Sequence, residues 1–180
     1  MEKRPWRTEF FARFVSEIAD TSPPVQRLLE LGSGPGFLAE QLLGALPDVA
    51  CVLLDFSPAM HALARARLGA HSARAQFVER NFKEPDWPSG LGCFQAVVTH
   101  QAVHELRHKR HAEMLHAQVR ALLEPGGCYL VGDHFAGEGG MQDHALYMTV
   151  EEQEQALRRA GFRSVRQILR KGSLVLHRAV

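Results

Sequence analysis

The sequence predicts an α/β domain with a doubly wound sheet of seven strands. Six strands are parallel, one at the end of the chain is antiparallel, helices lie on both faces, and a short helix precedes the first strand. Short apolar runs alternate with segments of helical period from residue 25 to residue 159, which is typical of parallel strands joined by crossover helices. Two apolar runs, 164–169 and 173–177, then flank Arg170-Lys171-Gly172, which indicates a closing hairpin.

The composition fits one globular domain and excludes several classes of protein. The 180 residues are 46% hydrophobic and 23% charged, and 21 Lys and Arg offset 20 Asp and Glu to a formal net charge of +1. A dedicated nucleic-acid binder is disfavoured, because this charge attracts polyanions weakly. No apolar run approaches the roughly 20 residues that cross a bilayer, and the N-terminus lacks a secretory pattern, so we expect a cytoplasmic protein without membrane contact. Isolated cysteines within apolar runs predict core thiols, not disulfides or metal ligands: Cys51, Cys93 and Cys128.

The individual elements follow from apolar periodicity and from glycine and proline breaks. Trp6, Phe10, Phe14 and Ile18 share one helical face and predict an N-terminal helix that ends before Pro23. Apolar runs predict strands at 25–31, 49–55, 75–79, 94–99 and 128–132. Helical periods predict helices at 37–46, 58–68, 103–123 and 150–159. We expect a single domain over 1–180, in which residues 1–24 form a helix that could act as a lid and residues 25–180 form the core.

Local capping patterns define three of the helix ends. Ser57 is a favourable N-cap, and Pro58 fits the first helical position behind it. Thr149 with Glu152 matches a capping box at the start of the last helix. The helix over 103–123 should stop at the turn formed by 125–127, Pro-Gly-Gly.

A glycine-rich turn between the first strand and the next helix carries the most information about function. Glycines let a ligand approach the backbone closely, and the N–H groups at a helix start favour an electronegative group. Asp55 ends the second strand, where a carboxylate can accept hydrogen bonds from both ribose hydroxyls. These features together predict an adenosine-containing cofactor. The turn residues expected to bind it are Gly32, Ser33, Gly34 and Gly36.

The spacing of the glycines separates this turn from a dinucleotide site. A dinucleotide fingerprint reads G-x-G-x-x-G, whereas the turn here reads G-x-G-x-G and has Phe37 at the sixth position. Glu30, two places before the first glycine, would repel a pyrophosphate but could accept a hydrogen bond from an ammonium group. Such a site suits S-adenosylmethionine, which has an amino-acid tail and no phosphate.

With these motifs the chain resembles the class I S-adenosylmethionine-dependent methyltransferases over nearly its whole length. Residues 30–36, 53–60, 78–82, 94–106 and 122–131 are similar to the family's motifs in order, and residues 151–162 resemble its usual ending. The resemblance implies a Rossmann-like fold, S-adenosylmethionine as methyl donor and S-adenosylhomocysteine as product. It also implies Asp55 on the ribose, Phe56 and Met60 beside the adenine, and cofactor contacts from Asn81, Phe82 and His100. Asn81 stands where the family often has Asp, and its carbonyl can still accept from the adenine amino group.

The acceptor side of the site should follow the fourth and fifth strands, because ligands of such sheets bind beyond the carboxyl ends of the strands. Histidines and a glutamine lie there: His100, Gln101, His104, His134 and His144. A histidine suits a general base near neutral pH. We expect His104 to be that base, with His134 as the second candidate. The competing interpretation is that these are surface or helix-capping histidines and that the enzyme acts by positioning alone.

Other interpretations of the sequence remain. Residues 104–108 match H-E-x-x-H, a zinc motif when both histidines lie on one helix, but Arg107 is charged and no third ligand motif follows, so we expect no metal. The fold could belong to a non-catalytic or regulatory cofactor-binding member, or to a nicotinamide-dependent reductase. The expected partner is a small-molecule acceptor, its identity is open, and nothing in the sequence indicates an oligomer.

Overall fold

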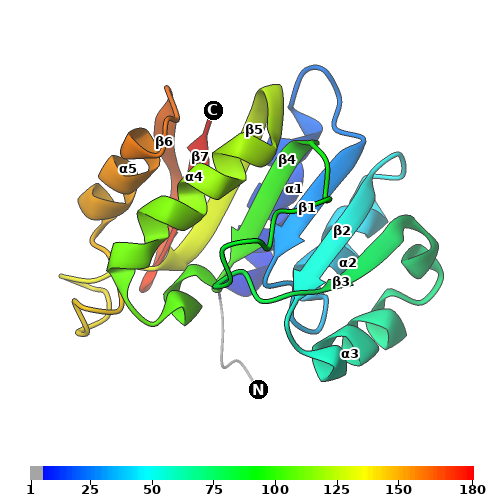
Figure 1. Cartoon of the computed structure of the whole chain (residues 1–180), viewed down its shortest axis with the longest axis horizontal. Coiled ribbons are helices and arrows are strands. Elements are labelled where there is room, and N and C mark those ends of the chain that lie inside the picture. The colour runs from blue at the N-terminus through cyan, green and yellow to red at the C-terminus, as the bar shows by residue number, and fades with distance from the viewer. Residues whose placement is uncertain (1–5) are drawn as a thin grey trace.

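The computed structural model describes residues 6–180 and contains the predicted seven-stranded sheet (Figure 1). The strands lie in the order β3-β2-β1-β4-β5-β7-β6. Strands β1 to β5 pair in parallel, and β7 is antiparallel to both β5 and β6, which confirms the predicted fold class. Their bounds are β1 Arg27–Leu31, β2 Ala50–Asp55, β3 Ala75–Glu79, β4 Phe94–His100, β5 Leu123–His134, β6 Val165–Lys171 and β7 Leu174–Ala179.

Helices cover both faces of the sheet (Figure 1). On one face α1, α2 and α3 bury residues such as Phe14 and Leu42 against the strands, and on the other α4 and α5 bury Leu115 and Leu157. Their bounds are α1 Arg7–Ala19, α2 Phe37–Ala45, α3 Pro58–Leu68, α4 Ala112–Leu122 and α5 Val150–Arg159. Short 3₁₀ helices span Gly69–Arg74, Val103–Leu106 and Lys109–His111. Residues 1–5 of the predicted N-terminal segment lie outside the described residues.

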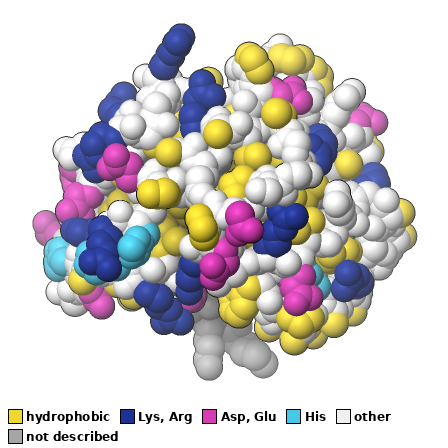
Figure 2. All heavy atoms as spheres, in the orientation of Figure 1, with side chains coloured by type: hydrophobic (Ala, Val, Ile, Leu, Met, Phe, Trp, Pro, Cys, Tyr) yellow, Lys and Arg dark blue, Asp and Glu magenta, His cyan; other side chains and the backbone are white. Residues whose placement is uncertain are grey.

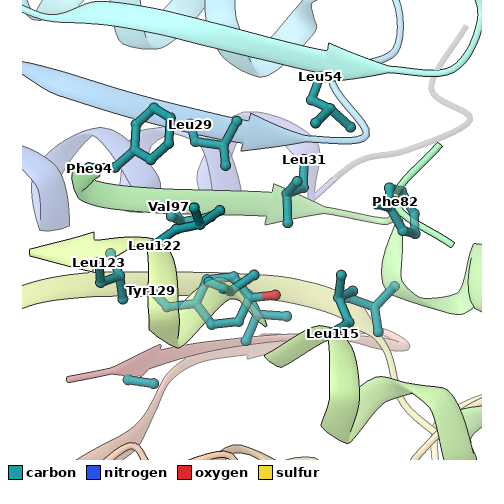
Figure 3. Close-up of a cluster of buried hydrophobic side chains, with 14 of the residues drawn as sticks. Leu29, Leu31, Leu54, Phe82, Phe94, Val97, Leu115, Leu122, Leu123 and Tyr129 are labelled. Atoms are coloured by element: carbon teal, nitrogen blue, oxygen red, sulfur yellow. The ribbon is translucent and has the colours of Figure 1, made fainter. Parts of the chain in front are cut away.

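The core is continuous through the central strands. Figure 3 shows Leu31 of β1, Val97 of β4, Tyr129 of β5 and Leu115 of α4 in one cluster of buried side chains. On the face drawn in Figure 2, basic and acidic side chains are interspersed, as the near-neutral net charge leads one to expect. Within residues 6–180, no helix is long and apolar enough to cross a membrane.

Two predicted helix starts are confirmed in atomic detail. The Ser57 side chain accepts the N–H of Met60, and Pro58 occupies the first turn of α3. At α5, the Thr149 side chain accepts the N–H of Glu152 while the Glu152 carboxylate accepts the N–H of Thr149. These reciprocal bonds satisfy two donors that a helix start otherwise leaves without partners.

The predicted helix over 103–123 is wrong at its start. Its first nine residues form two 3₁₀ helices, separated by Arg107 at φ 66° and an extended His108, and α4 begins only at Ala112. A tertiary contact competes with the helix here, because the Asp133 carboxylate accepts the backbone N–H of His104 at 2.9 Å.

The predicted fifth strand and hairpin turn also shift. β5 begins at Leu123 and includes the Pro-Gly-Gly sequence that we expected to be a turn, although the pairing with β4 is irregular there, between Phe94 and Ala96. The last turn falls at 172–173, since β6 extends through Lys171 and β7 begins at Leu174.

Candidate functional site

The glycine turn lies at the carboxyl end of β1, next to β4. The chain leaves β1 toward β2 on one side and later returns to β4 on the other, and such a switch point opens a crevice in α/β sheets. The N–H groups of Gly32 and Ser33 donate to the carbonyl of Leu54 at 2.8 and 3.1 Å, which fixes the turn against β2. Gly36 is the N-cap of α2 at φ 77°, a conformation that L side chains rarely adopt.

A pocket of about 170 Å³ opens beside this turn. The turn, the ends of β1 and β4 and the first turns of α1 and α2 line it. The structure thus brings together several predicted cofactor residues, Glu30, Gly32, Ser33, Gly34 and His100, along with Gln101 from the predicted acceptor side. The other lining residues are Arg7, Phe11, Pro35, Phe37 and Leu38.

Two polar atoms of this pocket are buried without a hydrogen-bond partner among residues 6–180: Oε2 of Glu30 and Oγ of Ser33. Burial, and second the charge of Asp55, raise the pKa of Glu30 to about 8, although a hydrogen bond from the backbone of Ala39 opposes the shift. A buried polar atom without a partner is costly. A ligand that offers a cationic donor to Glu30 would remove part of that cost.

Asp55 ends β2 on the far side of the glycine turn and is 7% exposed. Its carboxylate accepts the N–H of Gly34 at 2.8 Å and the N–H of Ser57 at 2.9 Å, so it tightens both the turn and the start of α3. Each carboxylate oxygen retains a second lone pair. The side chain can therefore accept hydroxyl donors as well, and its contact with a ribose stays a prediction.

The remaining predicted cofactor residues are not among those that line the pocket. Phe56 follows β2 and is 64% exposed, while Met60 is half-buried in the first turn of α3. Asn81 follows β3 and accepts the N–H of Lys83. Phe82 is buried close to Gly32 and lines a separate hollow of about 250 Å³ beside α4. Their contacts with an adenine stay predictions.

His104 forms a close pair with Asp133 at the carboxyl ends of β4 and β5. Its Nδ1 lies 2.7 Å from Oδ1 of Asp133, whose side chain is 5% exposed. Since a carboxylate only accepts, Nδ1 carries the proton and Nε2 of the neutral ring is left as acceptor. Burial lowers the pKa of His104, but the hydrogen bond and charge of Asp133 outweigh it, so the pKa stands above its ordinary value.

Two further rings, those of His134 and Tyr147, lie beside this pair. The ring centroids of His104, His134 and Tyr147 lie 5.6 to 6.0 Å from one another. Both ring nitrogens of His134 have side-chain partners, since Nε2 lies 2.8 Å from Nε2 of Gln101 and Nδ1 lies 2.9 Å from Oγ of Ser173. Asp133 also accepts the backbone N–H of His134 at 2.8 Å, so one carboxylate holds both histidines.

Comparison with known proteins identifies the family. A family model described as a methyltransferase domain matches residues 28–127, more than half of the chain. The chain belongs to the class I S-adenosylmethionine-dependent methyltransferases.

The chain is also similar to individual methyltransferases in sequence and in structure. A trans-aconitate 2-methyltransferase of Methylobacterium nodulans is 38% identical over 106 residues, which cover 58% of this chain and 37% of that protein. An O-methyltransferase family protein from Burkholderia thailandensis superposes with a TM-score of 0.77 at 18% identity, covering 94% of this chain and 55% of that one. The glycopeptide N-methyltransferase MtfA, in complex with S-adenosylmethionine, superposes with a TM-score of 0.74 at 19% identity. The match covers 96% of this chain and 93% of that one. The chain thus spans well under two thirds of the first two relatives.

The groups at the glycine turn and at the end of β2 have the chemistry that S-adenosylmethionine requires. A Cβ at Gly34 would meet no atom within 4 Å, so the turn presents open space to a ligand. The buried oxygen of Glu30 suits the cofactor's ammonium group, and the carboxylate of Asp55 suits its ribose. S-adenosylmethionine also agrees with the position of Glu30, because it has no phosphate that this carboxyl group would repel.

Sequence reasoning missed several residues of the methyltransferase site. Asp133 is the last residue but one of the buried strand β5 and precedes His134, a pattern that could have marked it as a partner of a nearby histidine. Arg7 and Tyr147 come from segments whose position depends on the folded chain, and no local pattern indicated them.

The H-E-x-x-H segment of the methyltransferase domain lacks the geometry that zinc binding requires. That motif needs both histidines on one α-helix. Here His104 lies in a 3₁₀ helix and His108 is extended, with the left-handed Arg107 between them. Across residues 6–180 no three His, Cys, Asp or Glu side chains are arranged to hold a metal ion.

Proposed function

We propose that this domain transfers the methyl group of S-adenosylmethionine to a hydroxyl oxygen of a small molecule, with His104 as the general base. The observation that carries the proposal is the 2.7 Å contact between His104 and the buried carboxylate of Asp133. The pair is linked to the glycine-turn pocket through His134, whose ring lies 6.0 Å from that of His104 and whose Nε2 lies 2.8 Å from the side chain of the lining residue Gln101. A histidine oriented in this way is suited to removing a proton, and an acceptor hydroxyl must lose one during methylation.

The cofactor would be held by residues of the first two strands. Glu30 would accept from the ammonium group, the backbone at Gly32 and Gly34 would allow close approach, and Asp55 would accept from the ribose hydroxyls. When bound, S-adenosylmethionine supplies an electrophilic methyl carbon on a sulfonium, whose sulfur retains the electron pair of the broken C–S bond.

His104 and Asp133 would handle the proton. Nε2 of His104 takes the proton of the acceptor hydroxyl as the oxygen forms its new bond to carbon, and Asp133 stabilises the imidazolium that results. The raised pKa of His104 makes it a stronger base than an ordinary histidine, at the cost of a smaller neutral fraction at pH 7. His134 is the weaker candidate for the base, because Gln101 and Ser173 engage its two nitrogens, and we assign it a positioning role.

A carboxylate acceptor is the second candidate, because the relative from Methylobacterium nodulans is named a trans-aconitate 2-methyltransferase. A carboxylate is already deprotonated near neutral pH and needs no base. The two candidates therefore differ in their need for His104.

Calorimetry tests the cofactor part of the proposal. S-adenosylmethionine and S-adenosylhomocysteine should bind, and NAD(H) should not. Asp55→Ala should weaken binding by about 1–3 kcal/mol, because the ribose hydroxyls lose a charged acceptor. Binding of the nicotinamide alone would reject the methyltransferase and favour a reductase, whereas binding without turnover on any acceptor would favour a non-catalytic member.

A metabolite library scored for methyl transfer tests the acceptor part. With a hydroxyl acceptor, His104→Ala should lower turnover about 10²- to 10⁴-fold while cofactor affinity is retained. His108→Ala is the matched control, since it removes a nearby histidine that has no contact with Asp133 among the described residues. Methylation of carboxylates alone, with His104→Ala as active as the wild type, would contradict the assignment of a base.

A further inference from the structure

The outward face of α4 is apolar, although a helix at the surface usually carries polar side chains there. Met114 is 67% exposed, and Ala117 and Ala121 are exposed one and two turns further along the helix. Their spacing places these three side chains on one stripe. The opposite side of α4 is buried in the core. Apolar residues on both sides are typical of a buried helix, so this stripe is suited to contact with a further protein surface.

Two open hollows flank this stripe. The larger, of about 720 Å³, lies between α4 and the end of α5, where Ala117 and Ala160 line it. The smaller is the hollow of about 250 Å³ between α4 and residues 82–85, and Met114 lines both. Residues 80–93, which connect β3 to β4, contain no helix, so on its face of the sheet α4 has a neighbouring helix, α5, on one side only (Figure 1). Met114 therefore forms a ridge between two depressions.

The charges at the two ends of the stripe are complementary to a second copy of the same stripe. Arg110 and Glu113 lie at its start, and Arg120 and Glu124 lie at its end. Arg110 and Glu124 are each seven positions from Ala117, while Glu113 and Arg120 are four and three positions from it. Two α4 helices that run antiparallel and meet at Ala117 therefore place each arginine opposite a glutamate. A parallel pair would place like charges together, which is unfavourable.

Contacts within one chain leave most of these charges without an opposite charge. None of Arg110, Arg120 and Glu124 forms an ion pair among residues 6–180, and Glu113 pairs with Arg159 at 2.7 Å at the exposed surface. Ion pairs at the rim of an interface add little affinity, but they select the partner and its orientation. We expect the charges to fix the antiparallel orientation and the apolar stripe to supply most of the free energy of association.

We propose that α4 binds the α4 of a second copy of this chain, antiparallel and about a twofold axis at Ala117. Such an interface uses the same surface of both copies, as homodimers do. Met114 of each copy enters the larger hollow of the other, beside Ala121, and the small alanine side chains let the helices approach closely. With 11 residues α4 is about 16 Å long, which makes the contact small for a specific interface. We therefore expect a reversible dimer with a dissociation constant of about 1–100 µM, independent of cofactor and acceptor.

Analytical ultracentrifugation of the full chain, at concentrations that bracket this range, tests the inference. Ala117→Glu should raise the dissociation constant of the dimer at least about 100-fold, because two carboxylates then meet at the twofold axis. Ala66→Glu is the matched control, since Ala66 is an exposed alanine of α3 on the other face of the sheet. It should leave the dissociation constant unchanged.

Reversal of the charges tests the orientation without altering the apolar stripe. Glu113→Arg and Arg120→Glu each place like charges at two symmetric positions and should raise the dissociation constant about 5- to 30-fold. The double variant Glu113→Arg/Arg120→Glu should return to within about threefold of the wild type, because each pair is restored with its charges exchanged. Mixed in equal amounts, the two single variants should associate more tightly than either does alone.

A wild type that stays monomeric at all these concentrations would overturn the inference. So would a dimer that Ala117→Glu leaves intact, since association would then use another surface. Equal losses in Ala117→Glu and Ala66→Glu would also contradict it, because the effect would not depend on α4. Single reversals without a loss, or a double variant that fails to recover, would overturn the antiparallel arrangement.

Discussion

Two glycines of the cofactor turn should respond differently to replacement by alanine. Gly32→Ala should mainly lower the stability of the fold, whereas Gly34→Ala should mainly weaken cofactor binding. Gly32 and Gly34 both have positive φ, 67° and 51°, so a side chain at either position is strained by about 1–2 kcal/mol. Their surroundings differ. A Cβ at Gly32 would lie 2.5 Å from Cβ of Ala102, whereas a Cβ at Gly34 would meet nothing within 4 Å.

The difference in stability between the two variants follows from these surroundings. Both variants gain about 0.4–1 kcal/mol from a less flexible unfolded chain, which offsets only part of the strain, so Gly34→Ala should lose about 0–1.6 kcal/mol of stability. Gly32→Ala carries an additional overpacking cost of about 1–3 kcal/mol, because Ala102 is buried and its backbone follows the strained Gln101. Gly32→Ala should therefore be less stable than Gly34→Ala by about 1–3 kcal/mol. The methyl group at Gly34 instead occupies ligand space and should weaken cofactor binding about 10- to 100-fold.

Urea unfolding and calorimetry with S-adenosylhomocysteine measure both effects. A double-mutant cycle adds a rescue test, since Ala102→Gly in the Gly32→Ala background removes the atom that clashes and should show a favourable coupling of at least about 1 kcal/mol. Equal stability of the two single variants, or wild-type affinity in Gly34→Ala, would refute the reasoning. The first result would mean that the turn relaxes freely, and the second that the ligand does not approach Gly34.

Three further predictions concern titratable groups. Asp133→Asn should move the acid limb of the turnover profile to lower pH and reduce turnover at least about tenfold, because Asp133 raises the pKa of His104; an unmoved limb would assign the limb to another group. Glu30, with a pKa of about 8, should release a proton when a cationic ligand binds, so cofactor affinity should rise from pH 6.5 to 8 and become independent of pH over this range in Glu30→Gln; calorimetry in buffers of different ionisation enthalpy counts the proton. His116 is fully buried with a pKa lowered to about 3, so the unfolded chain binds a proton there below pH 6.5 while the folded chain does not, and stability should fall by up to about 1.4 kcal/mol per pH unit as the pH drops toward 4. His116→Leu should flatten this slope in pH-dependent urea melts while the exposed control His71→Leu should not; equal slopes in both would contradict the prediction.

The sequence predicts elements well where the determinants are local. The α3 bounds of Pro58–Leu68 and the α5 bounds of Val150–Arg159 match the prediction, because the N-cap side chains of Ser57 and Thr149 act within three residues of themselves. The antiparallel last strand is predicted for a similar reason. A short turn between two apolar runs leaves the chain no room for a crossover connection, so the second run must return alongside the first.

Prediction fails where a distant residue decides the local conformation. The segment 103–111 has helical periodicity, yet the backbone N–H of His104 donates to Asp133, 29 positions further along the chain. Pro125-Gly126-Gly127 has the composition of a turn, yet its chain pairs irregularly with β4 and extends β5. Neither partner is visible in the local pattern, so the periodicity and the composition are correct observations that lead to the wrong element.

The same division applies to the site. The turn glycines, Glu30 and His100 are brought together because parallel strands end at one edge of the sheet, which the order of elements already implies. The position of Arg7 depends instead on how the aromatic face of α1 packs against the end of β4. The periodicity of apolar residues predicts which face of a helix is buried, but it does not predict which element that face packs against.

Gln101 shows why the histidine side of the site requires the folded structure. It has φ 57°, a strained conformation for a residue other than glycine, and such strain persists only where the surroundings impose it. Its backbone N–H donates to the carbonyl of Gly132 at 2.7 Å, and its side chain contacts Nε2 of His134, so β5 imposes the conformation from both sides. The 3₁₀ helix Val103–Leu106 begins two residues after Gln101. The following residues then bring His104 to Asp133. The candidate base is therefore positioned by the end of the neighbouring strand, and its role follows from strand order in the sheet more than from any motif in its own segment.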